Sequence, residues 1–185
     1  MKPSVEASLS VPALAGWRIP AAIIGGSLLM ALSAQITIPF WPVPMTMQVC
    51  ATFLLAGLAG GRLAAAMVVA YLAEAAVGLP VLAGGSAGLA PLVGPTGGYL
   101  LGFAVAAFLA GEWIRRRPGG LIGTAVPMLA GLGVIYLLGC LWLAQFTGWQ
   151  AVIAAGVAPF LAGDVLKVLL AAAVTIALRR LRRAA

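Results

Sequence analysis

Long apolar stretches separated by short polar breaks run through the whole chain. Two of them are short, and the minimal break Gly60-Gly61-Arg62 between these two predicts a pair of helices joined by a tight turn. The pattern therefore predicts an all-α integral membrane protein that forms a single membrane domain over residues 1–185. Six stretches approach the roughly 20 residues that a helix needs to cross a bilayer: residues 19–38, 46–60, 62–78, 97–114, 121–144 and 158–178.

Basic residues fall only in alternate connections between these stretches. The first, third and fifth connections contain none, and Lys167 lies inside the sixth stretch. By the positive-inside rule we expect six transmembrane helices in the cytoplasmic membrane, with both termini in the cytoplasm. The other basic residues lie in the N-terminal arm, the second and fourth connections and the C-terminal tail: Lys2, Arg18, Arg62, Arg115, Arg116, Arg117, Arg179, Arg180, Arg182 and Arg183.

The apolar run after Arg18 allows a second interpretation. Ala31-Leu32-Ser33 resembles the small-residue cleavage site that follows the hydrophobic core of a secretory signal peptide. We expect instead that this run is retained as the first helix, because an odd number of spans would destroy the alternation of the basic connections.

Composition narrows the possible functions. Hydrophobic residues make up 63% of the chain and charged residues 8%, far from the roughly half-apolar, quarter-charged balance of soluble domains. The net charge of +7 would suit a nucleic acid only if basic residues clustered with aromatic ones on a folded surface. Here the basic residues separate apolar stretches, so we expect membrane lipid and no nucleic acid as a partner.

The residue types that most enzymes and metal sites use are scarce. The chain has no histidine, and its two cysteines, Cys50 and Cys140, lie far apart in the sequence. An intramembrane enzyme would need a nucleophile with a base, or a metal cluster. We therefore expect no metal site, no cofactor and no enzyme activity.

The connections without basic residues are apolar and rich in proline and glycine. Residues 39–44 contain three prolines and two aromatics, which predicts a stiff, extended segment against the membrane surface. Residues 78–98 are rich in glycine, and residues 145–157 include a predicted short interfacial helix at 149–155. Loops this long are uncommon unless they are functional, so we expect them to form an outward-facing lid over a pocket.

Polar side chains in the apolar stretches lie near these loops. Asp164 and Lys167 are three residues apart, which places them on one face of the sixth helix. Glu74 lies near the outer end of the third helix, and Thr46 and Gln48 lie where the proline segment enters the second. Ionisable groups inside a membrane indicate function, although such groups also pair with one another for purely structural reasons. The set suits a small polar ligand better than a bare ion.

Small residues suggest two further features. Gly98 and Gly102 form a small-xxx-small face that permits close helix packing, and Gly97 and Gly98 can also present backbone N–H groups to an anion at the start of the fourth helix. On the first span, Ala22 and Gly26, with Ala21 and Gly25 beside them, suit either docking of another membrane helix or packing within the bundle.

Four motifs together resemble the BioY family, the biotin-binding S components of energy-coupling factor (ECF) transporters. They are Pro42-Val43-Pro44-Met45-Thr46-Met47-Gln48, Gly78-Leu79-Pro80-Val81-Leu82-Ala83-Gly84-Gly85, Gly94-Pro95-Thr96-Gly97-Gly98-Tyr99-Leu100-Leu101-Gly102-Phe103 and Pro159-Phe160-Leu161-Ala162-Gly163-Asp164-Val165-Leu166-Lys167.

The resemblance covers nearly the whole chain. It implies a six-helix subunit that captures biotin from outside at high affinity and takes it up. It also implies three partners, a transmembrane coupling subunit and two cytoplasmic ATPases, and agrees with the absence of a phosphate-binding loop from this sequence. Ala22 and Gly26 match the family's docking surface for the coupling subunit.

The resemblance also assigns roles in a biotin site. Asp164 can accept the two N–H groups of the ureido ring and Lys167 can donate to its carbonyl. Glu74, Gln48 or Thr46 can complete the contacts to the ring. Apolar walls are expected from Tyr99, Trp41 and Phe160, and the N–H groups of Gly97 and Gly98 are expected to hold the carboxylate.

A self-sufficient secondary transporter of biotin or another small vitamin is the alternative. In such a protein Asp164 or Glu74 would carry a proton. Inverted repeats would support this class, and the sequence shows no convincing internal repeat.

Overall fold

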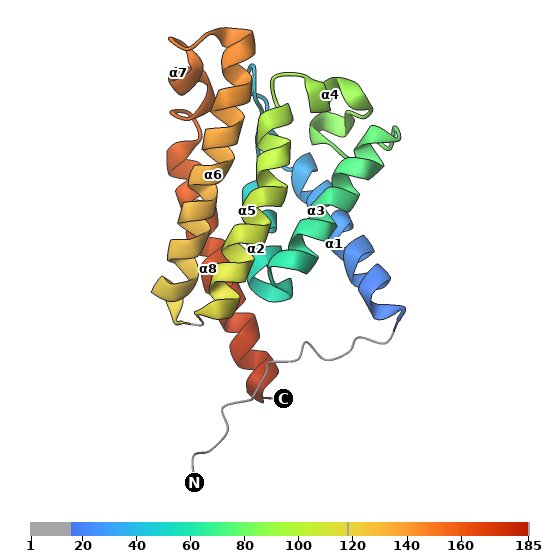
Figure 1. Ribbon diagram of the computed structural model, residues 1–185, viewed down its shortest axis with the longest axis vertical. Helices are drawn as coiled ribbons and strands as arrows, with labels where there is room; N and C mark the ends of the chain where they lie inside the picture. Colours follow the sequence, from blue (N-terminus) through green and yellow to red (C-terminus); the bar gives the residue numbers. More distant parts are fainter. Residues whose placement is uncertain (1–15, 118, 185) are drawn as a thin grey trace.

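The computed structural model describes residues 16–117 and 119–184, without the side chain of Arg183, and consists mostly of helices (Figure 1). Lys2 therefore lies outside the described residues. The longer helices are α1 (Arg18–Gln35), α2 (Gln48–Ala59), α3 (Gly61–Ala76), α5 (Gly97–Arg116), α6 (Leu121–Thr147) and α8 (Leu161–Ala184). The connections contain strands β1 (Thr37–Ile38) and β2 (Met45–Thr46), the 3₁₀ turn η1 (Ala83–Gly85), and helices α4 (Leu89–Val93) and α7 (Val152–Gly156).

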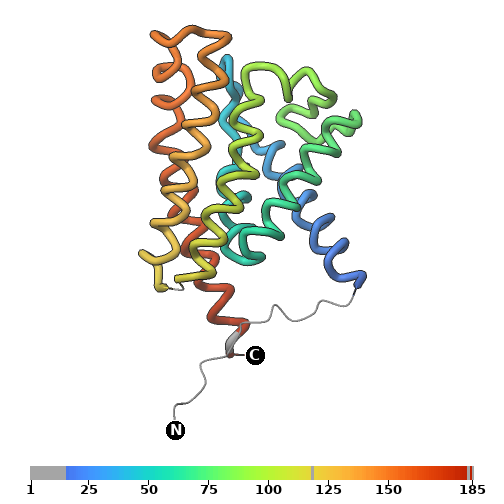
Figure 2. Tube along the Cα trace, viewed as in Figure 1, coloured from blue at the N-terminus to red at the C-terminus, as the bar shows by residue number. Residues whose placement is uncertain are grey.

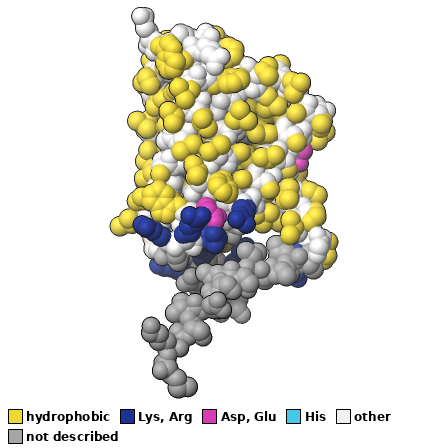
Figure 3. Space-filling view, in the orientation of Figure 1, with side chains coloured by type: hydrophobic (Ala, Val, Ile, Leu, Met, Phe, Trp, Pro, Cys, Tyr) yellow, Lys and Arg dark blue, Asp and Glu magenta, His cyan; other side chains and the backbone are white. Residues whose placement is uncertain are grey.

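The longer helices run back and forth between two ends of a bundle (Figures 1 and 2). One end, here called the arginine end, contains the starts of α1 and α3 and the ends of α5 and α8, with Arg18, Arg62, Arg115 to Arg117 and Arg179 to Arg182. The opposite end, the loop end, contains the β1–β2 hairpin, α4 and α7. Figure 3 shows the basic side chains in a band next to a largely apolar surface, as expected for a protein that leaves the bilayer at that level.

Among the described residues, four segments are long and apolar enough to cross a membrane: α1, α5, α6 and residues 152–182, which contain α7 and most of α8. The predicted second and third spans are shorter than expected, because α2 has 12 residues and α3 has 16. At 1.5 Å per residue α2 extends about 18 Å, less than the roughly 30 Å of a hydrocarbon core. Part of the predicted second span is instead strand β2.

Helix α5 lies at the centre and packs against α2, α3 and α6. Its glycines allow α6 to come close: a Cβ on Gly98 would lie 2.5 Å from the carbonyl oxygen of Leu138, and one on Gly102 would lie 3.1 Å from the Cα of Ile135. The predicted small-xxx-small packing face is therefore confirmed. Helix α5 ends at Arg116, two residues before Pro118, because a proline cannot follow a residue in helical conformation without a clash.

The connection of residues 39–44 is not extended, so that prediction was wrong. The chain turns back on itself, and β1 pairs antiparallel with β2, Thr37 opposite Thr46 and Ile38 opposite Met45. The prolines between them have no N–H to donate, so pairing is confined to the flanking residues. The same hairpin is the exception to the all-α prediction, and its Trp41–Pro42 peptide bond is cis.

The other two loop-end connections also contain ordered structure. Residues 78–98 include η1 and α4. The short helix predicted at 149–155 is present as α7, but it begins at Val152 because α6 continues to Thr147, beyond the predicted end at 144. Helix α6 stops at Gly148, whose positive φ of 78° is a conformation that glycine adopts readily and other residues rarely do.

Candidate functional site

A cavity of about 280 Å³ lies at the loop end, close to the lower limit of about 300 Å³ for typical small-molecule sites. A smaller cavity of about 40 Å³ adjoins it and contains Asp164 in its wall. Both are lined by Val43, Pro44, Thr46, Tyr99 and Phe103. The larger cavity is further lined by Pro42, Gln48, Leu82, Ala83, Ser86, Pro91, Pro95, Thr96 and Leu100, and the smaller by Met45, Val49, Ile135, Tyr136 and Phe160. The hairpin, the η1–α4 segment and the start of α5 therefore enclose one apolar space with few polar groups.

Asp164 and Lys167 contact each other; Asp164 lines the smaller cavity, whereas Lys167 lines neither cavity. The Nζ of Lys167 is 2.8 Å from Asp164 Oδ1 and donates a second hydrogen bond to the carbonyl oxygen of Thr46, at 2.7 Å. Asp164 is only 5% exposed, so its charge depends on these partners. Each carboxylate oxygen has two lone pairs and the ammonium has three donors, so the pair retains hydrogen-bonding capacity for a ligand.

Tyr136 is a third member of this cluster that the sequence analysis missed. Its hydroxyl, on α6, donates to Asp164 Oδ2 at 2.9 Å. The two carboxylate oxygens therefore have different partners, a cation on one and a neutral hydroxyl on the other. This arrangement fixes the plane of the carboxylate and directs it along the wall of the smaller cavity.

Thr46 and Gln48 form a second polar group in the larger cavity. The hydroxyl of Thr46 donates to Gln48 Oε1 at 3.1 Å, and Gln48 Nε2 donates to the hydroxyl of Tyr71 at 2.9 Å. Tyr71 lies on α3 and was also missed. Because Tyr71 holds the amide, Gln48 presents a fixed rather than a mobile polar group to the cavity.

Two of the three predicted aromatic walls are present. Tyr99 lines both cavities, and its hydroxyl donates to the carbonyl oxygen of Gly156 at 2.9 Å, which ties α5 to α7. Phe160 lines the smaller cavity and packs edge-to-face on Phe40, with ring centroids 5.9 Å apart. Trp41 is 89% exposed and does not line either cavity.

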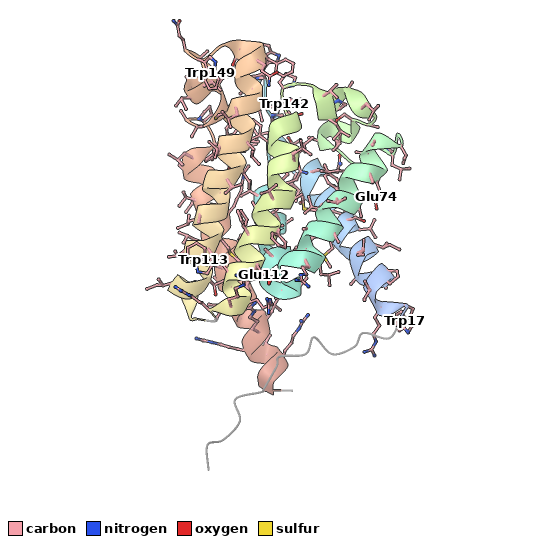
Figure 4. All side chains as sticks on the ribbon, in the orientation of Figure 1. Trp17, Glu74, Glu112, Trp113, Trp142 and Trp149 are labelled. Carbon is pink, nitrogen blue, oxygen red and sulfur yellow. The ribbon has the colours of Figure 1, made fainter. Side chains whose placement is uncertain are left out.

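Glu74 lies away from this site. Its carboxylate accepts a hydrogen bond of 2.7 Å from Ser27 on α1, and Figure 4 places it at the side of α3. It lines neither cavity at the loop end. In this structure the acid joins α1 to α3.

Gly97 and Gly98 lie at the start of α5, but they are covered by neighbouring groups. Gly97 donates its N–H to the carbonyl oxygen of Gly94 at 3.0 Å, and a Cβ on Gly98 would collide with the side chain of Trp142. The indole of Trp142 in turn donates to the carbonyl oxygen of Gly94 at 2.8 Å. These contacts give the two glycines a packing role, and neither glycine lines the cavities.

The small residues of α1 divide between two faces. A Cβ on Gly26 would overlap the side chain of Met67 on α3, so Gly26 faces the inside of the bundle. Ala22 is half-buried and packs against the core. Ala21 and Gly25 are exposed instead, and no heavy atom lies within 4 Å of a Cβ built on Gly25. The exposed small residues are therefore Ala21 and Gly25, each one position before the predicted docking residues Ala22 and Gly26.

Comparison with known proteins places the chain in a family. The sequence profile of the BioY family matches residues 7–184. This chain belongs to the BioY family. The family resemblance of the four sequence motifs is thus confirmed over nearly the whole chain.

Individual BioY proteins and a solved structure agree with this membership. A probable biotin transporter BioY from Pyrococcus horikoshii is 39% identical over 139 residues, which cover 75% of this chain and 82% of the relative. The biotin transporter BioY of Thermotoga maritima is 37% identical over 154 residues, 83% of this chain and 90% of the relative. The crystal structure of the S-component for biotin from an ECF-type ABC transporter matches with a TM-score of 0.78 at 27% identity, over 89% of this chain and 92% of that one.

Proposed function

We propose that this chain binds biotin at the loop end of the bundle and serves in its uptake as the substrate-specific subunit of an ECF-type transporter. The observation that carries the proposal is the cluster of Asp164, Tyr136 and Lys167, of which Asp164 and Tyr136 line the smaller of two adjoining apolar cavities. The similarity to BioY proteins described as biotin transporters supports the choice of ligand. The chain needs no cofactor in this role.

The chemistry of biotin matches the polar groups at the two cavities. The ureido ring has two N–H donors and one carbonyl acceptor, and the free lone pairs of Asp164 accept the former while the third Nζ donor of Lys167 serves the latter. The rest of the bicyclic ring and the aliphatic chain need apolar walls, which Val43, Phe103 and Tyr99 provide. The carboxylate then lies toward the mouth of the cavity. The N–H groups of Gly97 and Gly98 are our candidates for holding it, which requires that Trp142 moves and that Gly97 exchanges its hydrogen bond to Gly94 for one to the ligand.

Titration calorimetry tests the proposed ligand directly. Protein purified in detergent is titrated with biotin, and with thiamine and riboflavin as controls. We expect heat of binding with biotin alone. Absence of biotin binding by folded protein would remove the proposal.

We propose a single membrane domain of six crossings, with the arginine end and both termini in the cytoplasm. The alternation of the arginines supports this orientation. The short α2 completes its crossing together with the β1–β2 hairpin, whose Val43 and Thr46 are buried while Ile38, Phe40 and Trp41 stay exposed at the loop end. A thiol reagent that cannot cross membranes should label a cysteine at Ser86 in intact cells, and should label one at Arg117 only after lysis.

We propose that the partners are a transmembrane coupling subunit and two cytoplasmic ATPases. The exposed face of α1 supports a helix-docking role, because Ala21 and Gly25 form a smooth strip flanked by the exposed Ile24 and Leu28. Gly26 and Ala22, which the family resemblance pointed to, would support this strip from behind through their packing on α3 and the core. ATP hydrolysis would then belong to the partners.

Replacement of Tyr136 by phenylalanine tests the third member of the cluster. It removes one hydrogen bond from Asp164 Oδ2 while the ring keeps its place in the wall. We expect biotin affinity to fall roughly three- to tenfold, the net value of about one ordinary hydrogen bond. If calorimetry gives the same dissociation constant for biotin in the variant and the wild type, the hydroxyl of Tyr136 does not contribute to binding.

A proton-coupled secondary transporter is the alternative, and Glu74 is the observation that favours it. A carboxylate between α1 and α3, away from the binding cavity, is a suitable carrier for a coupled proton. The S-component proposal expects Glu74→Gln to leave biotin binding unchanged and uptake to depend on the coupling subunit. Uptake in cells without any coupling subunit, abolished by collapse of the proton gradient and by Glu74→Gln, would favour the alternative.

A further inference from the structure

A third cavity, of about 550 Å³ and larger than the two at the loop end, opens between α5 and α6 at the arginine end and is called the groove below. Its inner part is apolar, with Phe108 and Leu109 from α5 and Val134 from α6. Its rim contains Arg116 and Arg117, the last residues before the turn into α6. The cavity is therefore amphipathic along its length, apolar toward the membrane centre and cationic toward the membrane surface.

The rim has more positive than negative charge. Glu112 accepts hydrogen bonds from Nε of Arg115, at 2.9 Å, and from Nη2 of the same guanidinium, so that pair is close to neutral. Arg116 is 71% exposed through its side chain, and its Nε lies 4.0 Å from the same carboxylate oxygen. This one carboxylate lies against two arginines, Arg115 and Arg116, and Arg117 adds a further positive charge at the mouth of the cavity.

Two neighbouring features favour an anion at the level of the lipid headgroups. Helix α6 begins at Leu121, four residues after Arg117, and its N-terminus has no side-chain capping hydrogen bond, so the positive end of its dipole lies near the two arginines. Trp113 lines the same cavity and is labelled beside Glu112 in Figure 4. An exposed indole is typical of the boundary between hydrocarbon and water.

We propose that this groove binds an anionic phospholipid, with the phosphate held by Arg116 and Arg117 and one acyl chain lying along Phe108, Leu109 and Val134. A soluble phosphate could bind the arginines but would leave the apolar part of the groove empty. A transmembrane helix of a partner would have to bury the two arginines or pair them. A lipid satisfies both parts at once, since basic pockets between membrane helices hold anionic headgroups while apolar walls hold chains. The groove lies at the opposite end from the biotin cavity and is independent of it.

Native mass spectrometry of protein released from nanodiscs tests the proposal. The nanodiscs contain phosphatidylcholine mixed with phosphatidylglycerol, and retained phosphatidylglycerol is counted for wild type and for the double variant Arg116→Gln/Arg117→Gln. We expect the double variant to bind phosphatidylglycerol about 25-fold more weakly, at roughly fivefold for each arginine near a surface. The melting temperature of the wild type should rise with added phosphatidylglycerol, and that of the variant should not.

The matched control is Arg180→Gln/Arg182→Gln, which removes the same charge from the exposed end of α8, outside the groove. It should retain the lipid as the wild type does, and equal loss in both double variants would overturn the proposal in favour of diffuse charge attraction. Ala130→Phe, which fills the apolar part without changing charge, should also release the lipid. Stabilisation of the wild type by soluble glycerol phosphate alone would overturn the acyl-chain contact. Biotin affinity of the same variants should be unchanged. The lipid proposal can therefore be refuted without affecting the proposed biotin site, and the reverse also holds.

Discussion

The variant Asp164→Asn is expected to bind biotin at least tenfold more weakly than the wild type. Asparagine keeps the size of the side chain but replaces one carboxylate oxygen by an amide that donates, so it can accept from fewer N–H groups of the ureido ring. The hydrogen bonds that remain are no longer charge-assisted, a difference of roughly 1.4 kcal/mol or more at a buried site. Calorimetric titration of the purified variant measures the change.

Leu166→Met is the matched control for this prediction. Leu166 lies on the same helix, two residues away, and is 67% exposed on the lipid-facing side. It should bind biotin as the wild type does. If Asp164→Asn also keeps the wild-type dissociation constant, the carboxylate does not contact the ligand and the assignment of this residue fails.

Lys167→Met is expected to impair both stability and binding. The substitution leaves the nearly buried Asp164 with only the hydroxyl of Tyr136 and removes the hydrogen bond to the carbonyl oxygen of Thr46. Loss of one partner of a buried ion pair typically costs about 3–5 kcal/mol, because the other charge stays buried without compensation. We expect a clearly lower melting temperature in detergent and no measurable biotin binding.

A double variant separates these two effects. Asp164→Asn/Lys167→Met removes both charges, so it should recover most of the lost thermal stability while still failing to bind biotin. Lys167→Met protein that melts at the wild-type temperature would show that the ion pair contributes little to stability. Recovery of binding in the double variant would show that the charges serve only to neutralise each other.

The helices and the main charged pair could be predicted because their signals are local. A run of apolar residues specifies a membrane helix by its length alone, and Asp164 and Lys167 stand out because almost nothing else in their stretch is polar. The length of α2 was overestimated, since apolar composition does not distinguish the partly buried strand Met45–Thr46 from the helix that follows it.

The parts of the site that were missed depend on how each helix is rotated about its own axis. Glu74 lies near the expected outer end of α3, but its side chain contacts Ser27 rather than the cavity. Tyr136 and Tyr71 look like ordinary apolar residues in the sequence, and only the packing of α6 and α3 brings their hydroxyls to Asp164 and Gln48. Hydrophobic patterning is weak in helices surrounded by both lipid and protein, so it does not specify this rotation.

The ammonium of Lys167 has two partners, the carboxylate of Asp164 and the carbonyl oxygen of Thr46. It neutralises the acid on α8, and it also anchors the strand that leads out of the β1–β2 hairpin. Any ligand that draws this ammonium toward itself changes how firmly the hairpin is held, and any movement of the hairpin changes the donors that the ligand meets. Ligand binding at Lys167 and detachment of the hairpin would then be coupled, and each would shift the equilibrium of the other by the same free energy.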